Sequence, residues 1–273
     1  MLNFILLNAL ATLVLTEDRV FQPRYLENVP QTRVVGGEVA WPHSWPWQVS
    51  VQFQKPGPIK TWIHDCGGSL IRKTWVMTAA HCVDNPKTRR VVLGAHNLDK
   101  ENSLEQIMPV SSVIIHPQWN RRNISAGFDI ALIPLPTAAT LNSAVQLAVL
   151  PPSGQILPNN YPCYITGWGR TSSNGPQSNL LKEARLPIVD HQTCSRPDWW
   201  GSSHINTLIC AGGGSDSGCN GDSGSPLNCQ VEGRYYVHGV TSFISGAGCN
   251  TFQKPTVFTR VSAYIDWINN NAR

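Results

Sequence analysis

Three residue types that can act together in catalysis stand far apart in this 273-residue sequence. His81 follows an apolar run and precedes a cysteine, Asp129 opens another apolar run, and Ser223 stands between an aspartate and a glycine. A serine hydroxyl is a weak nucleophile until a base accepts its proton. Histidine has a suitable pKa for that role, and a buried aspartate can orient the ring and stabilise its charged form. The three residues therefore indicate nucleophilic catalysis by serine.

Ser223 lies in a glycine-rich stretch, residues 217–227. Glycine at this density destabilises both helix and strand, so the segment is expected to turn sharply and bring its N–H groups close to another molecule. Such groups can stabilise an oxyanion. Taken alone, the stretch suits a surface loop equally well, just as His81 suits a strand end and Asp129 a turn. The occurrence of all three neighbourhoods in one chain favours the catalytic interpretation.

The composition is that of a soluble globular protein. The formal net charge of +4 is small, with no dense run of Lys or Arg, so nucleic acid is not an expected partner. Residues 2–15 are apolar but too short to span a membrane, and their position suits a secretory signal. We place the signal peptide at residues 1–16, with cleavage at Ala11 or a buried N-terminal strand as alternatives. No other segment is apolar enough to span a membrane.

The sequence has eight cysteines, all after residue 65. Behind a signal peptide, an even number of cysteines indicates disulfides formed in an oxidising compartment, here four of them. The spacing alone does not choose among the many pairings. A zinc site is not expected, because there is no Cys-x-x-Cys pair and because His81 and Cys82 would point apart on a strand.

From Val34 onward the pattern is that of an all-β protein. Short apolar runs rich in Val, Ile, Thr and Trp alternate with turn residues, which suits barrels or sandwiches. A Pro-rich stretch separates two halves, residues 34–150 and 151–261. Residues 262–273 predict a C-terminal helix with Ser262 as its N-cap. The expected strands are 47–53, 69–79, 90–93, 110–115 and 130–135 in the first half, and 163–168, 182–189, 207–211, 226–229, 235–243 and 256–261 in the second.

The three motifs, in this order, resemble the chymotrypsin-like serine proteases. They are Thr78-Ala79-Ala80-His81-Cys82, Asp129-Ile130-Ala131-Leu132 and Gly221-Asp222-Ser223-Gly224. Residues 163–169, 199–201, 237–243 and 254–260 resemble the pancreatic chymotrypsin-like elastases within that family, and the resemblance extends over 34–273. The α/β-hydrolases have another order of catalytic residues, and Ser225 breaks their G-x-S-x-G pattern. The resemblance implies two antiparallel six-stranded β-barrels and a C-terminal α-helix, with the site in the cleft between the barrels.

The resemblance also implies a role for each site residue. Ser223 is then the nucleophile, His81 the general base and Asp129 the residue that orients it, as in the established mechanism of the family. The N–H groups of Gly221 and Ser223 form the oxyanion hole. An uncharged pocket floor and branched walls predict cleavage after Ala and then Val. The implied floor is Ser217, the walls are Ile244 and Thr256, and the strand that pairs with the substrate is Ser242, Phe243 and Ile244.

Four disulfides and an activation step follow from the same resemblance. The implied pairs are Cys66–Cys82, Cys163–Cys229, Cys194–Cys210 and Cys219–Cys249. Residues 17–33 are the expected propeptide, which a trypsin-like protease removes by cutting between Arg33 and Val34. The new Val34 amine then pairs with Asp222, which His64 and Ser50 could hold in the uncut form. The expected partners are protein and peptide substrates, the activating protease and protein inhibitors of a monomeric enzyme.

Three further features of the sequence bear on this interpretation. Ser225 stands where most active relatives have glycine and would be strained if its φ were positive; the alternative function is therefore a weakly active or inactive homologue that acts by binding. Ala95 and Lys100 replace expected ligands in the family's calcium loop, so we expect calcium binding to be weak or absent, with no other cofactor and Lys100 as a counter-ion to Glu105. Asn123 begins the sequon for N-glycosylation.

Overall fold

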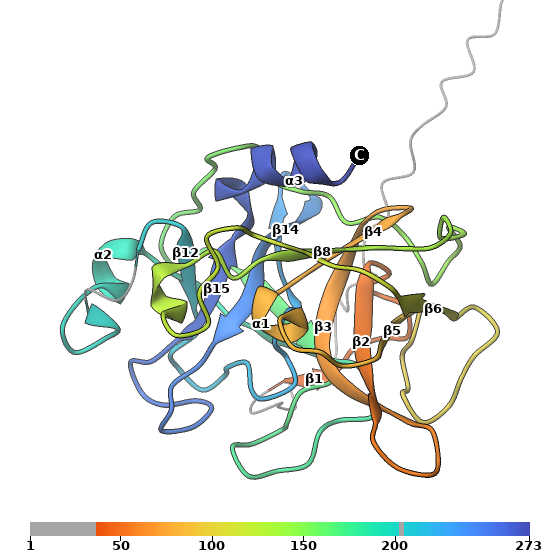
Figure 1. The fold of residues 1–273 in the computed structure, drawn as a ribbon. Helices are drawn as coiled ribbons and strands as arrows, with labels where there is room; N and C mark the ends of the chain where they lie inside the picture. The colour runs from red at the N-terminus through yellow and green to blue at the C-terminus, as the bar shows by residue number, and fades with distance from the viewer. Residues whose placement is uncertain (1–36, 202–204) are drawn as a thin grey trace, which may run out of the picture.

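The chain folds into two curled antiparallel sheets that pack side by side (Figure 1). The computed structural model describes residues 37–201 and 205–273, so the expected signal peptide, propeptide and Arg33–Val34 bond lie outside the described residues. The all-β class expected from the sequence is confirmed. No helix among residues 37–201 and 205–273 is long and apolar enough to cross a bilayer.

The first sheet comes from the first half of the described chain, in the order β6-β5-β2-β3-β4-β8-β7. Residues 69–79 form a hairpin instead of the single expected strand, because the chain turns between β3 and β4. Residues 110–115 likewise divide between β6 and β7. The strands are β2 (Gln48–Lys55), β3 (Thr61–Arg72), β4 (Trp75–Thr78), β5 (Arg89–Leu93), β6 (Gln106–Val110), β7 (Ile114–Ile115) and β8 (Ala131–Pro134).

The second sheet has the order β1-β10-β9-β13-β14-β15-β12-β11. When the two-residue strands β1, β7 and β11 are set aside, each sheet has the six strands expected of a barrel. The strands are β1 (Glu38–Val39), β9 (Cys163–Gly167), β10 (Lys182–Arg185), β11 (Ile188–Val189), β12 (Leu208–Ala211), β13 (Pro226–Val231), β14 (Arg234–Phe243) and β15 (Thr256–Arg260).

Strand β1 corrects the expected division of the chain. We expected residues from 34 onward to belong to the first barrel, yet Glu38 pairs with Glu183 and Val39 with Lys182 of β10. The N-terminal end of the described chain is therefore held by the second sheet. Local sequence could not show this, since a two-residue strand has no periodicity of its own.

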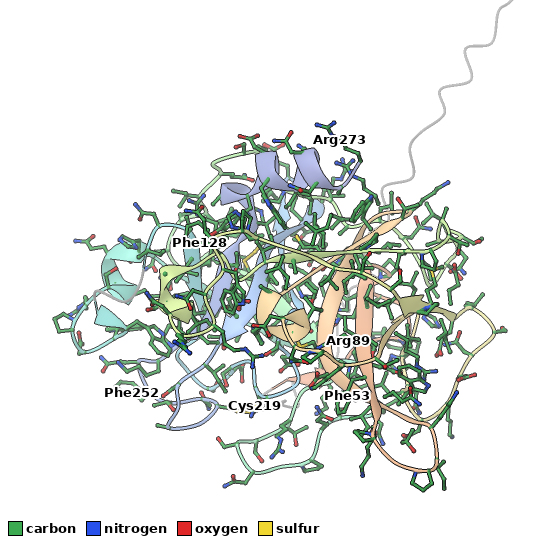
Figure 2. The ribbon with its side chains drawn as sticks, in the orientation of Figure 1. Phe53, Arg89, Phe128, Cys219, Phe252 and Arg273 are labelled. Atoms are coloured by element: carbon green, nitrogen blue, oxygen red, sulfur yellow. A yellow bond between two sulfur atoms is a disulfide. The ribbon has the colours of Figure 1, made fainter. Side chains whose placement is uncertain are left out.

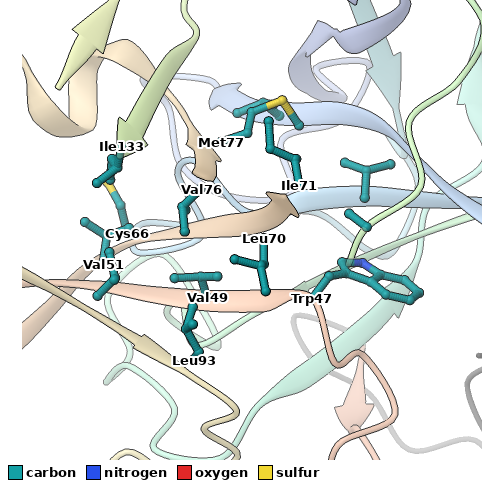
Figure 3. Close-up of a cluster of buried hydrophobic side chains, with 14 of the residues drawn as sticks. Trp47, Val49, Val51, Cys66, Leu70, Ile71, Val76, Met77, Leu93 and Ile133 are labelled. Atoms are coloured by element: carbon teal, nitrogen blue, oxygen red, sulfur yellow. The ribbon is translucent and has the colours of Figure 1, made fainter. Parts of the chain in front are cut away.

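Buried hydrophobic side chains from the strands of the first sheet pack against one another in its core (Figure 3). Val49 of β2, Leu70 of β3 and Val76 of β4 are fully buried. Burying such a side chain stabilises the fold by about 1.5–3 kcal/mol. The opposite face of β2 is also buried, but it carries the polar Gln48 and Ser50. Gln48 hydrogen-bonds Ser225 and Thr166, and Ser50 hydrogen-bonds His64.

The C-terminal helix, α3 (Ile265–Asn271), packs at one end of the molecule (Figure 1). Ser262 is not its N-cap, because the helix begins after a separate 3₁₀ turn, η3 (Val261–Ala263). The Ser262 hydroxyl instead donates to the Gln155 carbonyl at 2.6 Å and accepts from Arg260. The Ser262 side chain therefore makes tertiary hydrogen bonds instead of the helix cap that the local sequence predicted.

All four disulfides implied by the resemblance are present. Cys66 is bonded to Cys82, Cys163 to Cys229, Cys194 to Cys210, and Cys219 to Cys249. The helix α2 (His191–Cys194) supplies one of these cysteines.

Candidate active site

His81 lies on the short helix α1 (Ala80–Val83), which follows β4 after Ala79 and lies between the two sheets (Figure 1). We expected it at the end of a strand, so this local assignment was wrong. The ring Nδ1 is 2.8 Å from Asp129 Oδ2, and the His81 backbone N–H donates to Oδ1 at 2.9 Å. Cys66, His81 and Cys82 lie close together, but both sulfurs belong to one disulfide and cannot act as thiolate ligands for zinc.

Asp129 is fully buried and is held by α1 and by the second sheet. In addition to His81, the Ser242 hydroxyl of β14 donates to Asp129 Oδ2 at 2.5 Å. The Thr259 hydroxyl of β15 donates to the Asp129 carbonyl at 2.8 Å. A buried carboxylate is costly unless it is hydrogen-bonded, and these contacts supply the compensation. Phe128, just before it, has φ of +62°, a conformation that aims the carboxylate at a cost in backbone strain.

The surroundings of His81 act on its pKa in opposite directions. Burial lowers the pKa, but the hydrogen bond from the ring to Asp129 and the charge of that carboxylate together outweigh burial, so the pKa is raised. The more distant Asp84 raises it further and Arg121 lowers it. Arg121 Nη2 lies 2.6 Å from Asp84 Oδ1 and donates to the His81 carbonyl at 3.2 Å.

We expect Arg121→Ala to move the acidic limb of kcat/KM to higher pH. The substitution removes a positive charge that lowers the pKa of His81, and it leaves the Asp84 carboxylate with Trp119 as a hydrogen-bond donor but without its cationic partner. The pKa of His81 should therefore rise, and the ring must be unprotonated to act as a base. The plateau at high pH should stay unchanged. Arg122→Ala is the matched control, since it removes the same charge from the next residue. A limb that stayed in place or moved to lower pH in pH–rate profiles would contradict the assignment.

The nucleophile segment is bent by glycines, as its composition predicted. Gly221 has φ of +98° and Gly224 has φ of +76°. The Ser223 carbonyl accepts from the Gly67 N–H of β3 at 2.7 Å. The N–H groups of Gly221 and Ser223 donate to no backbone acceptor within the described ranges. These two donors are therefore available to a substrate, as an oxyanion hole requires.

The Ser223 hydroxyl makes no hydrogen bond to His81 among the described residues. Catalytic hydrogen bonds are often long without substrate and shorten in the complex. The structure thus places the ring of His81 and the carboxylate of Asp129 in contact, and it ties the backbone of Ser223 to β3 of the first sheet through Gly67.

Asp222 points into a small crevice lined by Gly167, Gly169 and Ser217. Its carboxylate accepts hydrogen bonds of 2.9 Å from the N–H groups of Gly169 and Cys219. Burial raises the pKa of Asp222 to about 6, an effect that these two bonds only partly offset. No Lys, Arg or His within residues 37–201 and 205–273 forms an ion pair with it.

His64 and Ser50 do not hold Asp222 in this structure. Ser50 Oγ lies 2.8 Å from His64 Nδ1, and His64 Nε2 lies 2.9 Å from the Gly221 carbonyl. Burial lowers the pKa of His64 to about 4, more than its bond to Gly221 raises it. A neutral His64 donates through Nε2 and accepts through Nδ1, so the pair fixes the peptide plane of Gly221.

A cavity of about 680 Å³ opens beside Ser223. Phe53 and Cys219, which line it, lie on the side of the molecule away from α3 (Figure 2). Of the expected substrate-binding residues, Ser242, Phe243 and Ile244 line this cavity. Ser217 and Thr256 lie outside its lining and are buried.

The space at these last two positions is closed by a hydrogen bond. The Thr256 hydroxyl accepts from the Gly218 N–H at 2.8 Å, which joins one expected wall of the pocket to the residue that follows its expected floor, Ser217. A Cβ on Gly218 would also lie 3.2 Å from the Thr256 methyl group. Little room remains above Ser217 for a long side chain.

Ser225 is free of the strain that its position suggested. It is not among the described non-glycine residues with positive φ, so serine is no worse there than any other residue. The side chain is fully buried.

The structure includes both the expected calcium loop, with Ala95, Lys100 and Glu105, and the sequon that begins at Asn123. Asn102, not the expected Lys100, is bonded to Glu105, at 2.9 Å, and no ion pair joins Lys100 to Glu105 among the described residues. Ala95 is buried. Asn123 is exposed and accepts from the Ser125 hydroxyl, just before the turn η1 (Ile124–Ala126).

Sequence reasoning missed the contacts that connect the sheets around the site. Ser242 was expected only to pair with substrate, and Thr259 was not singled out, yet both hydrogen-bond Asp129. Gly67 was likewise missed, although a glycine pair after Cys66 is a visible signal of close backbone approach.

Comparisons with known proteins agree with this geometry. The profile of the Trypsin family matches residues 34–268. The chain is 57% identical over 246 residues to chymotrypsin-like elastase family member 1 of Macaca fascicularis, covering 89% of this chain and 91% of that protein. It is 57% identical to family member 3B of Homo sapiens, covering 88% of each, and 54% identical to family member 1 of Felis catus, covering 99% and 98%. The chain therefore belongs to the trypsin family of serine endopeptidases, among the chymotrypsin-like elastases.

Proposed function

We propose that this chain is a secreted digestive endopeptidase, made as a zymogen, that cleaves proteins after small aliphatic residues through an acyl-enzyme on Ser223. The observation that carries the proposal is the bond between His81 Nδ1 and the fully buried Asp129. It leaves the other ring nitrogen of His81 as the proton acceptor. The N–H groups of Gly221 and Ser223 donate to no backbone acceptor within residues 37–201 and 205–273, so they are free to bind an oxyanion. The relatives named above are elastases, which supports the same reaction.

In the proposed reaction, Ser223 Oγ attacks the scissile carbonyl and its proton passes to His81 Nε2. The Asp129 carboxylate stabilises the resulting imidazolium, which gives that proton to the leaving amine. Water then attacks the acyl-enzyme with His81 again as the base. The N–H groups of Gly221 and Ser223 stabilise the oxyanion of both steps by about 3 kcal/mol per donor.

Specificity for a small side chain before the cut bond follows from the closed pocket. Methylene groups that do not fit cost about 1–3 kcal/mol each, so kcat/KM should fall from Ala to Val and then to Leu, Phe and Arg. Thr256→Gly removes the hydroxyl that bonds Gly218 and should raise the rate for Phe relative to Ala. Arg should stay poor in both proteins because Ser217 offers no charge. Wild-type preference for Arg or Phe in a peptide series would refute this.

Calcium should bind weakly or not at all, and no other cofactor is needed for this chemistry. Glu105 keeps a protein partner in Asn102, while Ala95 supplies no ligand atom. Titration calorimetry of the mature enzyme should show no calcium affinity in the micromolar range. A micromolar Kd would contradict this expectation.

Titration of active sites tests the function as a whole. Protein treated with trypsin, which is the model for the activating protease, should react with a fluorophosphonate at one site per chain. Ser223→Ala protein should not react, and uncut wild type should react far more slowly. Absence of reaction in cut wild-type protein would favour a homologue that acts by binding.

A further inference from the structure

The Ser225 side chain sits in a slot between the two sheets. A Cβ on Gly67 of β3 would overlap the Ser225 hydroxyl, and one on Gly167 of β9 would lie 3.1 Å from it. The hydroxyl therefore lies against one glycine of each sheet. Gln48 Nε2 of β2 donates to it at 3.3 Å.

Gln48 is itself a link between the sheets. Its side chain is 2% exposed, and its Oε1 accepts from the Thr166 hydroxyl of β9 at 2.7 Å. Apart from Ser225, the only acceptor near Gln48 Nε2 in the described ranges is the Val49 carbonyl at 3.5 Å. Loss of the Ser225 hydroxyl would thus leave a buried amide without a hydrogen bond of normal length.

The backbone of Ser225 fixes the nucleophile loop on its other side. Its N–H donates to the Asp222 carbonyl, and its own carbonyl accepts from the N–H and hydroxyl of Thr241, all at 2.9 Å. Ser225 is therefore a rigid neighbour of Ser223, and a shift of its side chain would be transmitted to the nucleophile.

The same slot is connected to the base. Gly67, against which the Ser225 hydroxyl lies, donates its N–H to the Ser223 carbonyl. Its neighbour Cys66 is bonded to Cys82, next to His81. Ser223 lies in the loop before β13 of the second sheet, and His81 lies on α1, which follows β4 of the first sheet, so contacts at Gly67 set the distance between them.

We propose that Ser225 is a positioning residue, whose hydroxyl, through Gln48 and Gly67, holds the nucleophile loop in register with the sheet that carries His81. The proposal rests on the function proposed above. On this proposal Ser225 adds a contact between the two sheets, and its presence does not indicate an inactive homologue.

The test compares kcat per titrated active site in trypsin-activated protein. Ser225→Ala should lower kcat by about three- to tenfold with KM unchanged, since small misplacements of reacting groups reduce the rate. Ser262→Ala is the matched control: its buried hydroxyl also makes hydrogen bonds, but away from the site. It should keep wild-type kcat whatever it does to thermal stability.

A double-mutant cycle tests the route through Gln48. Gln48→Met should cause a similar loss, and Ser225→Ala combined with it should be no slower than the slower single variant. A Ser225→Ala kcat within about twofold of wild type, or losses that multiply, would overturn the inference. Because each rate is divided by titrated sites, such a result would leave the proposed function standing; failure of wild type to titrate would overturn both.

Discussion

Asp129→Asn protein should fold, undergo trypsin cleavage normally and then turn over peptides about 10⁴-fold more slowly than wild type. The reason lies in the three hydrogen bonds that the two carboxylate oxygens accept, two from His81 and one from Ser242. Asparagine has one acceptor oxygen. If that oxygen stays with the His81 backbone N–H, the amide nitrogen faces the ring and donates to Nδ1. The ring proton then moves to Nε2, which can no longer accept the proton of Ser223.

Active-site titration followed by kcat measurement from pH 6 to 9 checks this prediction. Ser242→Ala is the graded control, because it removes one hydrogen bond to Asp129 without exchanging acceptor for donor. The kcat of Ser242→Ala should fall far less, by about tenfold, in line with the loss of a single hydrogen bond to a charged group. An Asp129→Asn enzyme that kept a tenth of the wild-type kcat would show that the carboxylate does not orient His81.

The parts of the site that the sequence predicted are those with distinctive neighbours. His81 beside Cys82, Asp129 before an apolar strand and Ser223 among glycines each stand in a short motif. In the structure, His81 and Asp129 are in hydrogen-bond contact, and the N–H groups of Gly221 and Ser223 are unpaired in the described ranges. Motifs of this kind are readable because the chemistry requires particular residue types at a fixed spacing.

The parts that could not be predicted depend on contacts between the sheets. Ser242 lies in a strand where small polar residues are common, and nothing local indicates its bond to Asp129. The pairing of β1 with β10 joins residues about 145 positions apart, which strand periodicity does not encode. Ser262 shows the converse, since a strong local capping signal was overridden by bonds to Gln155 and Arg260.

Asp222→Asn protein should fold and be cleaved, but it should gain little activity from the cleavage. In cut wild-type protein the Val34 amine is the expected partner of Asp222, and without that ion pair the loop with the oxyanion donors loses its order. We therefore expect kcat/KM after cleavage to fall about 10²–10³-fold, the loss typical of an impaired oxyanion hole. Asp216→Asn, which removes an equal charge from the same segment outside the crevice, should remain close to wild type.

In the uncut protein, Asp222→Asn should preserve stability at neutral pH, whereas in the cleaved protein it should reduce activity. The pKa of Asp222 is raised from 3.8 to about 6, with burial as the main cause. The folded state thus binds this proton more tightly than the unfolded chain does, so the stabilisation is complete below about pH 4 and is lost as pH rises through about 6. Asparagine does not titrate, and uncut Asp222→Asn should lack this decline in melting temperature between pH 4 and 7. Two results would contradict the proposal that Asp222 binds the Val34 amine after cleavage. One is full activity of cleaved Asp222→Asn protein, and the other is a rise in the melting temperature of uncut wild type over this pH range that depends on Asp222.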